Sequence, residues 1–241
     1  MASRCWSWFS RTVVPKTGPV LLAVDDTLAR HTGKHIASAG MHRDPLLSCA
    51  NRLFWHFGHN WVVVAVVVHF PRWNKSYSLP VLARLYRTTK VNEALGLPHR
   101  KKTELASELI ALVSKHHPGR GFKVVGDNAF VNRSVFRHLP GNVDFVGRGR
   151  MDAALYDPAP EYRGVGRPRV RGDKVASPQN RRKKWCALEV DIYGRPATVK
   201  ARVFKAVWYR VSYNKELLFV VIRDWPGHVK IEPFLDAVGY G

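Results

Sequence analysis

Two stretches decide the fold of this chain: LLAVDDT at residues 21–27 and FKVVGDN at residues 122–128. Each is a short apolar run that leads into aspartate, which predicts a buried strand followed by a carboxylate. A carboxylate just beyond a buried strand lies at the edge of a sheet, close to solvent but on a rigid element. If the two strands are neighbours, Asp127 will lie near Asp25 or Asp26.

The patterns around these stretches predict one mixed α/β core over residues 20–146. In chain order we expect strands at Val20–Val24, Trp61–Phe70 and Leu79–Tyr86, a helix at Thr103–His116, a strand at Phe122–Val125, a short helix at Asn128–Leu139 and a strand at Val143–Val146. Thr103 is the expected N-cap of the long helix, whose apolar residues have helical spacing. Residues 27–44 are polar and predict a loop. This order of elements matches a ribonuclease H-like mixed sheet with helices.

The chain changes character after residue 146. Residues 147–184 are rich in Gly, Pro and Arg, and β-like patterns return at Trp185–Ile192, Val199–Phe204, Val207–Tyr213 and Leu217–Arg223. Residues 148–215 hold 17 Lys and Arg against 6 Asp and Glu, about half of the net charge. A solvated loop with a small structural sheet is the plainer interpretation. The density of arginine favours a basic insertion that holds a nucleic-acid backbone.

These patterns divide the chain into four parts. We expect an N-terminal remnant at 1–19, the ribonuclease H-like core at 20–146, a basic β-rich insertion at 147–215, and the last core strand with the C-terminus at 216–241.

The charge of the whole chain favours a polyanionic partner. It carries 39 Lys and Arg against 18 Asp and Glu, a formal net charge of +21 over 241 residues. Basic side chains release counterions from phosphates, and interleaved aromatic residues favour nucleic acid over a membrane surface. The apolar run 61–70 is too short to span a bilayer, so we expect no membrane partner. Three scattered cysteines without a CxxC pair fit the reducing cytoplasm.

Aspartates that converge from two strands suit a divalent metal ion. Mg²⁺ takes oxygen ligands, usually a few carboxylates with water or phosphate oxygens, and two such ions can drive phosphodiester cleavage. Asp26 with Asp127 is one candidate pair. Asp25 is the alternative to Asp26, because successive strand residues face opposite sides. In the structural alternative, Asp25 caps a turn and Asp127 caps the following helix.

Three segments resemble bacterial insertion-sequence DDE transposases. LAVDDT at 22–27, followed by GKH at 33–35, resembles their first-aspartate motif, residues 102–130 resemble the helix and second-aspartate strand, and LLFVVIRD at 217–224 resembles a later strand. The resemblance implies a ribonuclease H-like core, Mg²⁺ or Mn²⁺ as cofactor, and DNA cleavage and strand transfer at transposon ends and target. It implies Asp26, directly before threonine, and Asp127 as the first two catalytic acids and metal ligands.

The third acid departs from that family's pattern. The family's Tyr-x-x-Arg-x-x-x-Glu motif does not occur in this chain. Glu232 comes after the corresponding strand but precedes Pro233, which suits a turn rather than a helix interior. The chain stops at Gly241, so we expect a truncated or degenerate transposase with an incomplete metal site. The rival interpretations are an inactive nucleic-acid binder and another ribonuclease H-like nuclease, acting on Holliday junctions or RNA–DNA hybrids.

Basic residues are the expected contacts to DNA. The candidates are Lys34, Arg150, Arg167, Arg169, Arg171, Arg181, Arg182, Lys183 and Lys184. A homodimer on DNA is one assembly to expect of such a protein, and the bacterial cytoplasm, at the nucleoid, is the expected compartment.

Overall fold

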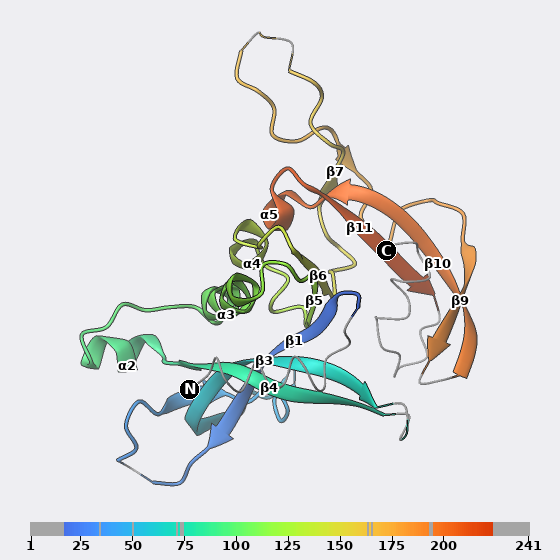
Figure 1. The fold of residues 1–241 in the computed structure, drawn as a ribbon. Coiled ribbons are helices and arrows are strands. Elements are labelled where there is room, and N and C mark those ends of the chain that lie inside the picture. Colours follow the sequence, from blue (N-terminus) through green and yellow to red (C-terminus); the bar gives the residue numbers. More distant parts are fainter. Residues whose placement is uncertain are drawn as a thin grey trace. The chain divides into compact units, whose positions relative to one another are not determined.

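The computed structural model describes residues 17–223, except residues 34, 50, 71, 73, 74, 163, 165, 193 and 194. They form a mixed α/β structure of two compact units (Figure 1). The first unit contains the described residues up to His69 and Ser76–Gly147. The second contains the described residues of 70–75 and those from Arg148 onward.

The first unit is built on a six-stranded sheet. Its elements are β1 Val20–Arg30, β2 Gly40–Arg43, β3 Trp55–Phe70, β4 Lys75–Tyr86, α2 Thr89–Ala94, α3 Lys102–His116, β5 Phe122–Gly126, α4 Arg133–Arg137 and β6 Val143–Gly147. The strands lie in the order β2-β3-β1-β5-β6, and β4 also pairs with β3. β1 is antiparallel to β3 and parallel to β5, which is parallel to β6. The strands that carry the two decisive stretches are therefore neighbours.

Strand β1 is longer than the sequence predicts. Its pairing with β5 ends where Val24 lies opposite Gly126, but its pairing with β3 continues until Arg30 lies opposite Gly58. β3 begins at Trp55 rather than at residue 61, and its additional residues supply the backbone partners that keep β1 extended. The polar composition after residue 26 suggested a loop. The sequence pattern does not show that the start of β3 pairs with these residues.

The predicted loop over residues 27–44 is wrong for a second reason. Residues 40–43 form the short strand β2, which pairs with the start of β3. Gly58 of β3 lies so close to β1 that a side chain there would overlap the backbone carbonyl oxygen of Ala29. Glycine at this position therefore allows β3 to pair with β1 on one side and β2 on the other.

Helix α3 buries one apolar face. Its buried apolar residues are Leu105, Ala106, Leu109, Ile110 and Val113. The N-cap is Lys101 rather than the predicted Thr103, and the backbone N–H of Lys101 donates to Glu104 Oε2 at 2.9 Å. An acid three residues into a helix can satisfy the N-cap amide in this way, so Glu104 determines where the helix begins.

The two shorter helices differ from the sequence-based expectation. α4 covers only Arg133–Arg137 of the predicted Asn128–Leu139, because the Asn132 side chain accepts from the Ser134 N–H at 3.0 Å and caps the helix there. α2 lies between β4 and α3, in a segment for which the sequence predicts no element. No helix in the described part of the chain is both long and apolar enough to cross a membrane.

The second unit is built on a five-stranded sheet. Its elements are β7 Leu155–Tyr156, β8 Lys174–Val175, β9 Cys186–Ile192, β10 Arg195–Val207, α5 Tyr209–Ser212 and β11 Glu216–Arg223. The order is β11-β10-β7-β8, with β9 also paired to β10. Val190, Val199 and Ala201 form a small buried cluster between β9 and β10. The long, curved β10 is thus the strand that organises the unit (Figure 1).

Two predicted strands behave differently in this unit. A strand was expected at Val207–Tyr213. Instead, β10 ends at Val207 and helix α5 follows, with Trp208 and Val211 buried. β11, expected as the last strand of the core sheet, instead pairs with β10 along its whole length. The Phe219 ring stacks on Phe204 of β10 with centroids 5.5 Å apart, which favours this partner. Residues 224–241 lie outside the described part.

Candidate metal centre

Three aspartates lie where the parallel pairing of β1 with β5 ends. Val24 and Gly126 form the last pair. The next residue after Val24 is Asp25, and the next after Gly126 is Asp127. Asp25 and Asp26 stay extended, because β3 continues to pair with this part of β1. The two are therefore inside a strand, whereas the sequence predicts them beyond its end. The carboxylates remain at an edge, since β5 gives way to a turn at this point.

Asp26 is held by two side chains from distant parts of the chain. The Lys102 ammonium lies 2.6 Å from Asp26 Oδ2, and Asn60 Nδ2 donates to the same oxygen at 3.0 Å. Lys102 is the first residue of α3, and Asn60 lies on β3. The Asp26 side chain is only 20% exposed, so this ion pair is partly shielded from solvent. The positive charge of Lys102 therefore balances the negative charge of Asp26.

Asp25 has the opposite electrostatic environment. Burial raises the pKa of its carboxyl, and the neighbouring carboxylates of Asp26 and Asp127 raise it further. A hydrogen bond from the Asp26 N–H at 2.8 Å and the charge of Lys102 lower it, but the net shift is upward. Because the carboxylates of Asp26 and Asp127 raise the pKa of Asp25, both lie within electrostatic range of it. Asp25 and Asp127 therefore repel each other, and a cation between them would relieve the repulsion.

Asp127 begins the turn that follows β5. Its Oδ1 accepts from the Ala129 N–H at 2.9 Å, and the Phe130 N–H donates to its carbonyl oxygen at 3.2 Å. A Cβ added at Gly126 would lie 2.8 Å from the Phe145 ring, so the backbone just before Asp127 is closely packed. The structural alternative predicts that Asp127 caps the following helix, which is wrong: Asp127 caps a turn, and Asn132 caps α4.

Several polar residues around Asp26 were not singled out from the sequence. Lys102 also lies over the Tyr86 ring, 5.3 Å from its centroid. Burial and the Lys102 charge lower the pKa of His42, which is buried on β2, against the opposing effect of Asp26. Asn60 is 1% exposed within a strand of valines. A polar residue in such an apolar run was the available signal, because buried polar groups are the informative exceptions.

The basic residues predicted to contact DNA fall into two groups. Arg167, Arg182 and Lys184 are exposed, as are two ion-paired arginines, Arg150 and Arg169. Arg150 forms a two-pronged pair with Asp152 at 2.9 and 2.7 Å, and Arg169 lies 3.9 Å from Asp173. Lys34 lies outside the described residues. These exposed groups are available to a polyanion.

The residues of the second group contact other parts of the protein. The Arg171 guanidinium lies between the rings of Tyr156 and Tyr209, 4.2 and 4.3 Å from their centroids. It closes the base of loop 157–173, whose ends are joined by the pairing of β7 with β8.

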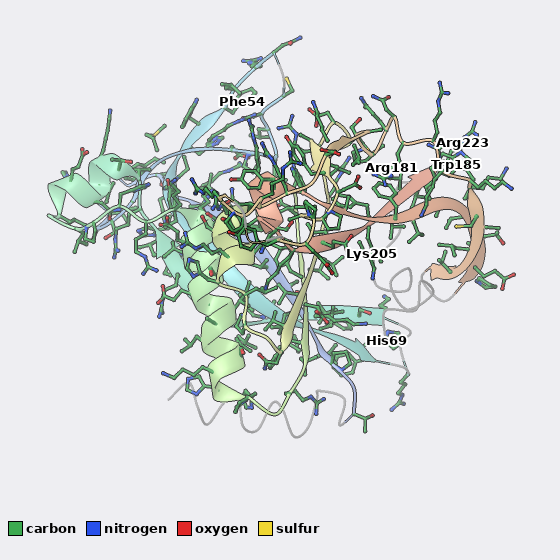
Figure 2. The ribbon with its side chains drawn as sticks, turned by 90° about the horizontal axis from the view of Figure 1, so that it is seen from above. Phe54, His69, Arg181, Trp185, Lys205 and Arg223 are labelled. Carbon is green, nitrogen blue, oxygen red and sulfur yellow. The ribbon has the colours of Figure 1, made fainter. Side chains whose placement is uncertain are left out.

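Three further basic residues surround the sheet of the second unit. Arg181 lies 4.6 Å from the Phe204 ring, Lys183 donates to the Val203 carbonyl at 3.0 Å, and Arg202 stacks on Trp185 at 4.0 Å. Figure 2 shows Arg181, Trp185 and Lys205 among the side chains of this sheet. Arg181 and Lys183 therefore contribute to packing at least as directly as to a surface charge.

Comparisons with known proteins show the family of the chain. A comparison with curated proteins gave no match. A solved structure, described as the cryo-EM structure of a piggyBac transposase synaptic complex with hairpin DNA, is similar with a TM-score of 0.38 and 14% identity. The alignment covers 98% of this chain and 40% of that chain, so this chain spans less than half of its length. A family model described as DDE superfamily endonuclease matches residues 2–205. The chain belongs to the DDE superfamily of endonucleases.

Proposed function

We propose that the chain is the catalytic part of a DDE-type transposase, which cleaves DNA and transfers its strands with the help of a divalent metal ion. Its substrates are transposon ends and target DNA, at the nucleoid in the bacterial cytoplasm. The observation that carries the proposal is that Asp25 and Asp127 lie within electrostatic range of each other at the end of the β1–β5 pairing. Membership of the endonuclease superfamily supports the reaction class.

The first unit supplies a ribonuclease H-like core in this proposal. Its strand order β4-β3-β1-β5-β6 supports it, with β3 antiparallel and β5 and β6 parallel to β1. A meander followed by strand–helix–strand units produces that order. The second unit is the insertion that holds DNA, through its exposed basic residues Arg167, Arg182 and Lys184 rather than through the stacked Arg171 and Arg181.

The carboxylates fit a hard divalent cation. Such ions bind oxygen ligands. The pKa of Asp25 is raised by partial burial and by the neighbouring carboxylates. Superfamily members generally use divalent metal ions, and Mg²⁺ or Mn²⁺ would polarise the scissile phosphate and activate the attacking hydroxyl or water. Asp127 is the ligand common to both candidate pairs. The sequence motif favours Asp26 as its partner, whereas the electrostatic interaction with Asp127 favours Asp25.

Lys102 determines which of the two aspartates is available. Its ammonium neutralises Asp26 at 2.6 Å, so Asp26 can bind a metal ion only after Lys102 moves away. Asp25 needs no such displacement. In the resting chain Asp25 and Asp127 are therefore the more accessible pair, and Asp26 holds Lys102 until substrate or metal arrives.

A metal titration tests the proposal directly. Mn²⁺ binding to the whole chain, followed by electron paramagnetic resonance, should show a site that is lost in Asp127→Asn. Comparison of Asp25→Asn with Asp26→Asn then identifies the partner ligand. Nicking of supercoiled plasmid DNA by the wild type in Mn²⁺ should be absent in Asp127→Asn. An unchanged Mn²⁺ isotherm in all three variants would exclude a metal centre at these aspartates.

A second candidate function is a nucleic-acid binder without catalysis. It is favoured by one observation: in the described part of the chain no group of three or more His, Cys, Asp or Glu side chains is arranged to hold a metal ion. Glu232, the weak candidate for a third acid, lies outside that part. DNA binding that is unaffected by Mn²⁺ and by Asp127→Asn, with no nicking, would establish this function instead.

A further inference from the structure

The hairpin made of β2, the loop 44–54 and the first residues of β3 exposes large apolar side chains that the proposed chemistry does not use. Each of these residues is between 47 and 87% exposed. We call them together the apolar hairpin: Met41, Leu46, Leu47, Leu53 and Trp55. Single exposed apolar residues are common on protein surfaces, but several on one hairpin indicate a surface that another molecule covers.

The pairing of the two strands places Met41 and Trp55 on the same face. Met41 lies opposite Phe57, and Arg43 lies opposite Trp55. Directly opposed residues of antiparallel strands point to the same side, and every second residue along a strand shares that side. His42, between Met41 and Arg43, is buried on the opposite side. The outer face of the hairpin therefore combines apolar side chains with the positive charge of Arg43.

Hydrogen bonds hold the loop that carries the leucines. The buried carboxylate of Asp44 accepts from the N–H groups of Leu46 and Leu47 at 3.0 and 3.2 Å. The Ser48 hydroxyl oxygen accepts from the N–H of Phe54, which ends the loop (Figure 2), at 2.9 Å. The leucines are thus exposed on an ordered loop. Burial against another molecule would remove their apolar surface from water, which is favourable.

Strand β2 also offers backbone groups for pairing. It is the last strand in the order of the first sheet, and among the described residues it pairs only with β3. The Asp44 N–H donates to the Phe54 carbonyl at 2.9 Å, so the alternation of antiparallel pairing makes His42 the next residue of β2 that is hydrogen-bonded to β3. The backbone N–H and C=O groups of Met41 and Arg43 then point to the free edge. An extended peptide can pair with such an edge.

The exposed charges of the hairpin are positive. Arg43 and Arg52 are exposed, and neither forms an ion pair with a carboxylate among the described residues. The acid of the hairpin, Asp44, is buried and contacts Arg30 and His56. A partner with carboxylates beside its apolar side chains therefore complements this surface. A second copy would bring like charges together, in a chain whose net charge is +21.

We propose that the apolar hairpin docks an extended segment of another protein. The segment pairs with the free edge of β2, its apolar side chains cover Met41, Trp55 and the loop leucines, and its Asp or Glu residues contact Arg43 and Arg52. The proposal does not depend on the proposed function, because the aspartates of the candidate metal centre lie outside the hairpin.

The test begins with a random-peptide phage library that is selected on the immobilised whole chain. The enriched peptides should combine several apolar residues with Asp or Glu. The most enriched peptide, made with a fluorescent label, should bind Leu46→Ser/Trp55→Ala about tenfold or more weakly than the wild type, because a covered aromatic anchor carries much of the affinity. No enrichment, enriched peptides without acids, or equal binding to the variant would overturn the proposal.

Trp61→Ala is the matched control. Trp61 is exposed on the same strand and the same face, about 20 Å from Trp55, and its variant should bind the peptide as the wild type does. An equal loss in Trp61→Ala would overturn the proposal. The far-ultraviolet circular dichroism of each variant shows whether it folds.

A second pair of substitutions tests the charge of the partner. Arg43→Gln/Arg52→Gln should bind the peptide about threefold or more weakly than the wild type at low salt, because two ion pairs are lost. The difference should vanish at high salt, where such pairs are screened. Equal binding at low salt would overturn the acidic partner.

Two modified peptides test the pairing with β2. Alternate amides are N-methylated in each, beginning at the first residue in one and at the second residue in the other. Only one set of amides faces β2. One version should therefore bind about tenfold or more weakly, and the other about as well as the unmodified peptide. Equal binding by the two versions would overturn the pairing with this edge.

Two further measurements test other occupants of the hairpin. A wild-type dimer in analytical ultracentrifugation that Trp55→Ala abolishes would assign the hairpin to a second copy and overturn the proposal. Binding of the wild type, but not of Trp55→Ala, to neutral phosphatidylcholine vesicles would overturn it in favour of a lipid surface. Asp127→Asn should bind the peptide as the wild type does, so a failure of the metal centre leaves this proposal standing.

Discussion

The two units hold their partly buried charges in different ways. In the first unit charges meet opposite charges, as in the Lys102–Asp26 pair and in the 2.5 Å contact of Arg30 with the buried Asp44. In the second unit the half-buried arginines lie on aromatic rings, as Arg171 does. An ion pair depends on pH and salt, whereas an arginine on a ring keeps its charge across the pH range and requires its planar shape. The difference predicts that metal ions and pH affect the stability of the first unit. In the second unit, the planar shape of the arginine side chains should matter more than their charge.

The largest expected effect is on Mn²⁺ affinity, when one carboxylate of the first unit is removed. Asp127→Asn removes a proposed ligand and relieves the repulsion with Asp25, so Mn²⁺ affinity should fall by about 100-fold or more. Isothermal titration calorimetry measures this fall. Asp144→Asn, at an exposed position on the neighbouring strand β6, is the matched control and should bind as the wild type does. Equal losses in the two variants would mean that Asp127 has no special place in the cluster.

Removing the cation of the same cluster should destabilise the first unit. Lys102→Met leaves Asp26 without its ion-pair partner, and Asp25 without a nearby positive charge, at a cost of about 1–3 kcal/mol at neutral pH. Urea unfolding measures the loss, and saturating Mn²⁺ should restore more stability to this variant than to the wild type, because the ion replaces the missing charge. Lys101→Met, at the adjacent exposed N-cap, controls for the loss of a surface lysine. A variant that is insensitive to Mn²⁺ would contradict the metal site.

A charge-preserving change should affect only the second unit. Arg171→Lys keeps the positive charge but cannot stack between Tyr156 and Tyr209, which costs about 1–2 kcal/mol locally. The amides of Asp157 and Gly172, which are hydrogen-bonded at the base of loop 157–173, should then exchange with solvent about tenfold faster. Arg167→Lys, at an exposed position of the same loop, should not change these rates. Unchanged exchange in Arg171→Lys would show that charge alone closes the loop.

The smallest expected effect concerns the proton of Asp25. The pKa of this carboxyl is raised in the folded chain, so the stability linked to it is complete at pH values below its ordinary pKa and is lost as the pH rises through the raised value. Asp25→Asn should therefore stabilise the chain at pH 7 by less than about 1 kcal/mol, since the group is half-exposed. The gain should shrink as the pH falls from 7 toward 4.

Urea unfolding across this pH range measures the effect. Asp144→Asn is again the control, and it should give no stabilisation at any pH. Destabilisation by Asp25→Asn at pH 7 would mean that the carboxylate makes a favourable contact that outweighs the repulsion.

Apolar runs made most of the first sheet predictable. The valine-rich runs of β3 and β5 are typical of buried strands. The order of the elements then predicted a parallel neighbour for β1. The end of β1 was not predictable, because it depends on backbone pairing with the first part of β3, where Gly58, His59 and Asn60 interrupt the apolar pattern. Helix α5 was missed because the buried Trp208 and Val211 have the composition of a strand.

The candidate site was predictable only in part, for a related reason. The aspartates stand out because a carboxylate after an apolar run is unusual. Lys102 is one of many lysines in a strongly basic chain, and only the fold shows that its ammonium reaches Asp26. Likewise, the count of arginines predicts a basic surface but does not reveal which of them have a ring beside them. Contacts between residues far apart in the chain determine both outcomes.

The position of β1 in the sheet has a consequence for how the chain folds during synthesis. One edge of β1 pairs with β3, which follows closely, but its other edge pairs with residues 122–126. Pairings between segments so distant in the chain form slowly, because a long loop must close first. Until β5 leaves the ribosome, an apolar strand edge stays open to pairing with other chains. Slow translation between β4 and β5 should therefore increase aggregation more than a pause of equal length after β6.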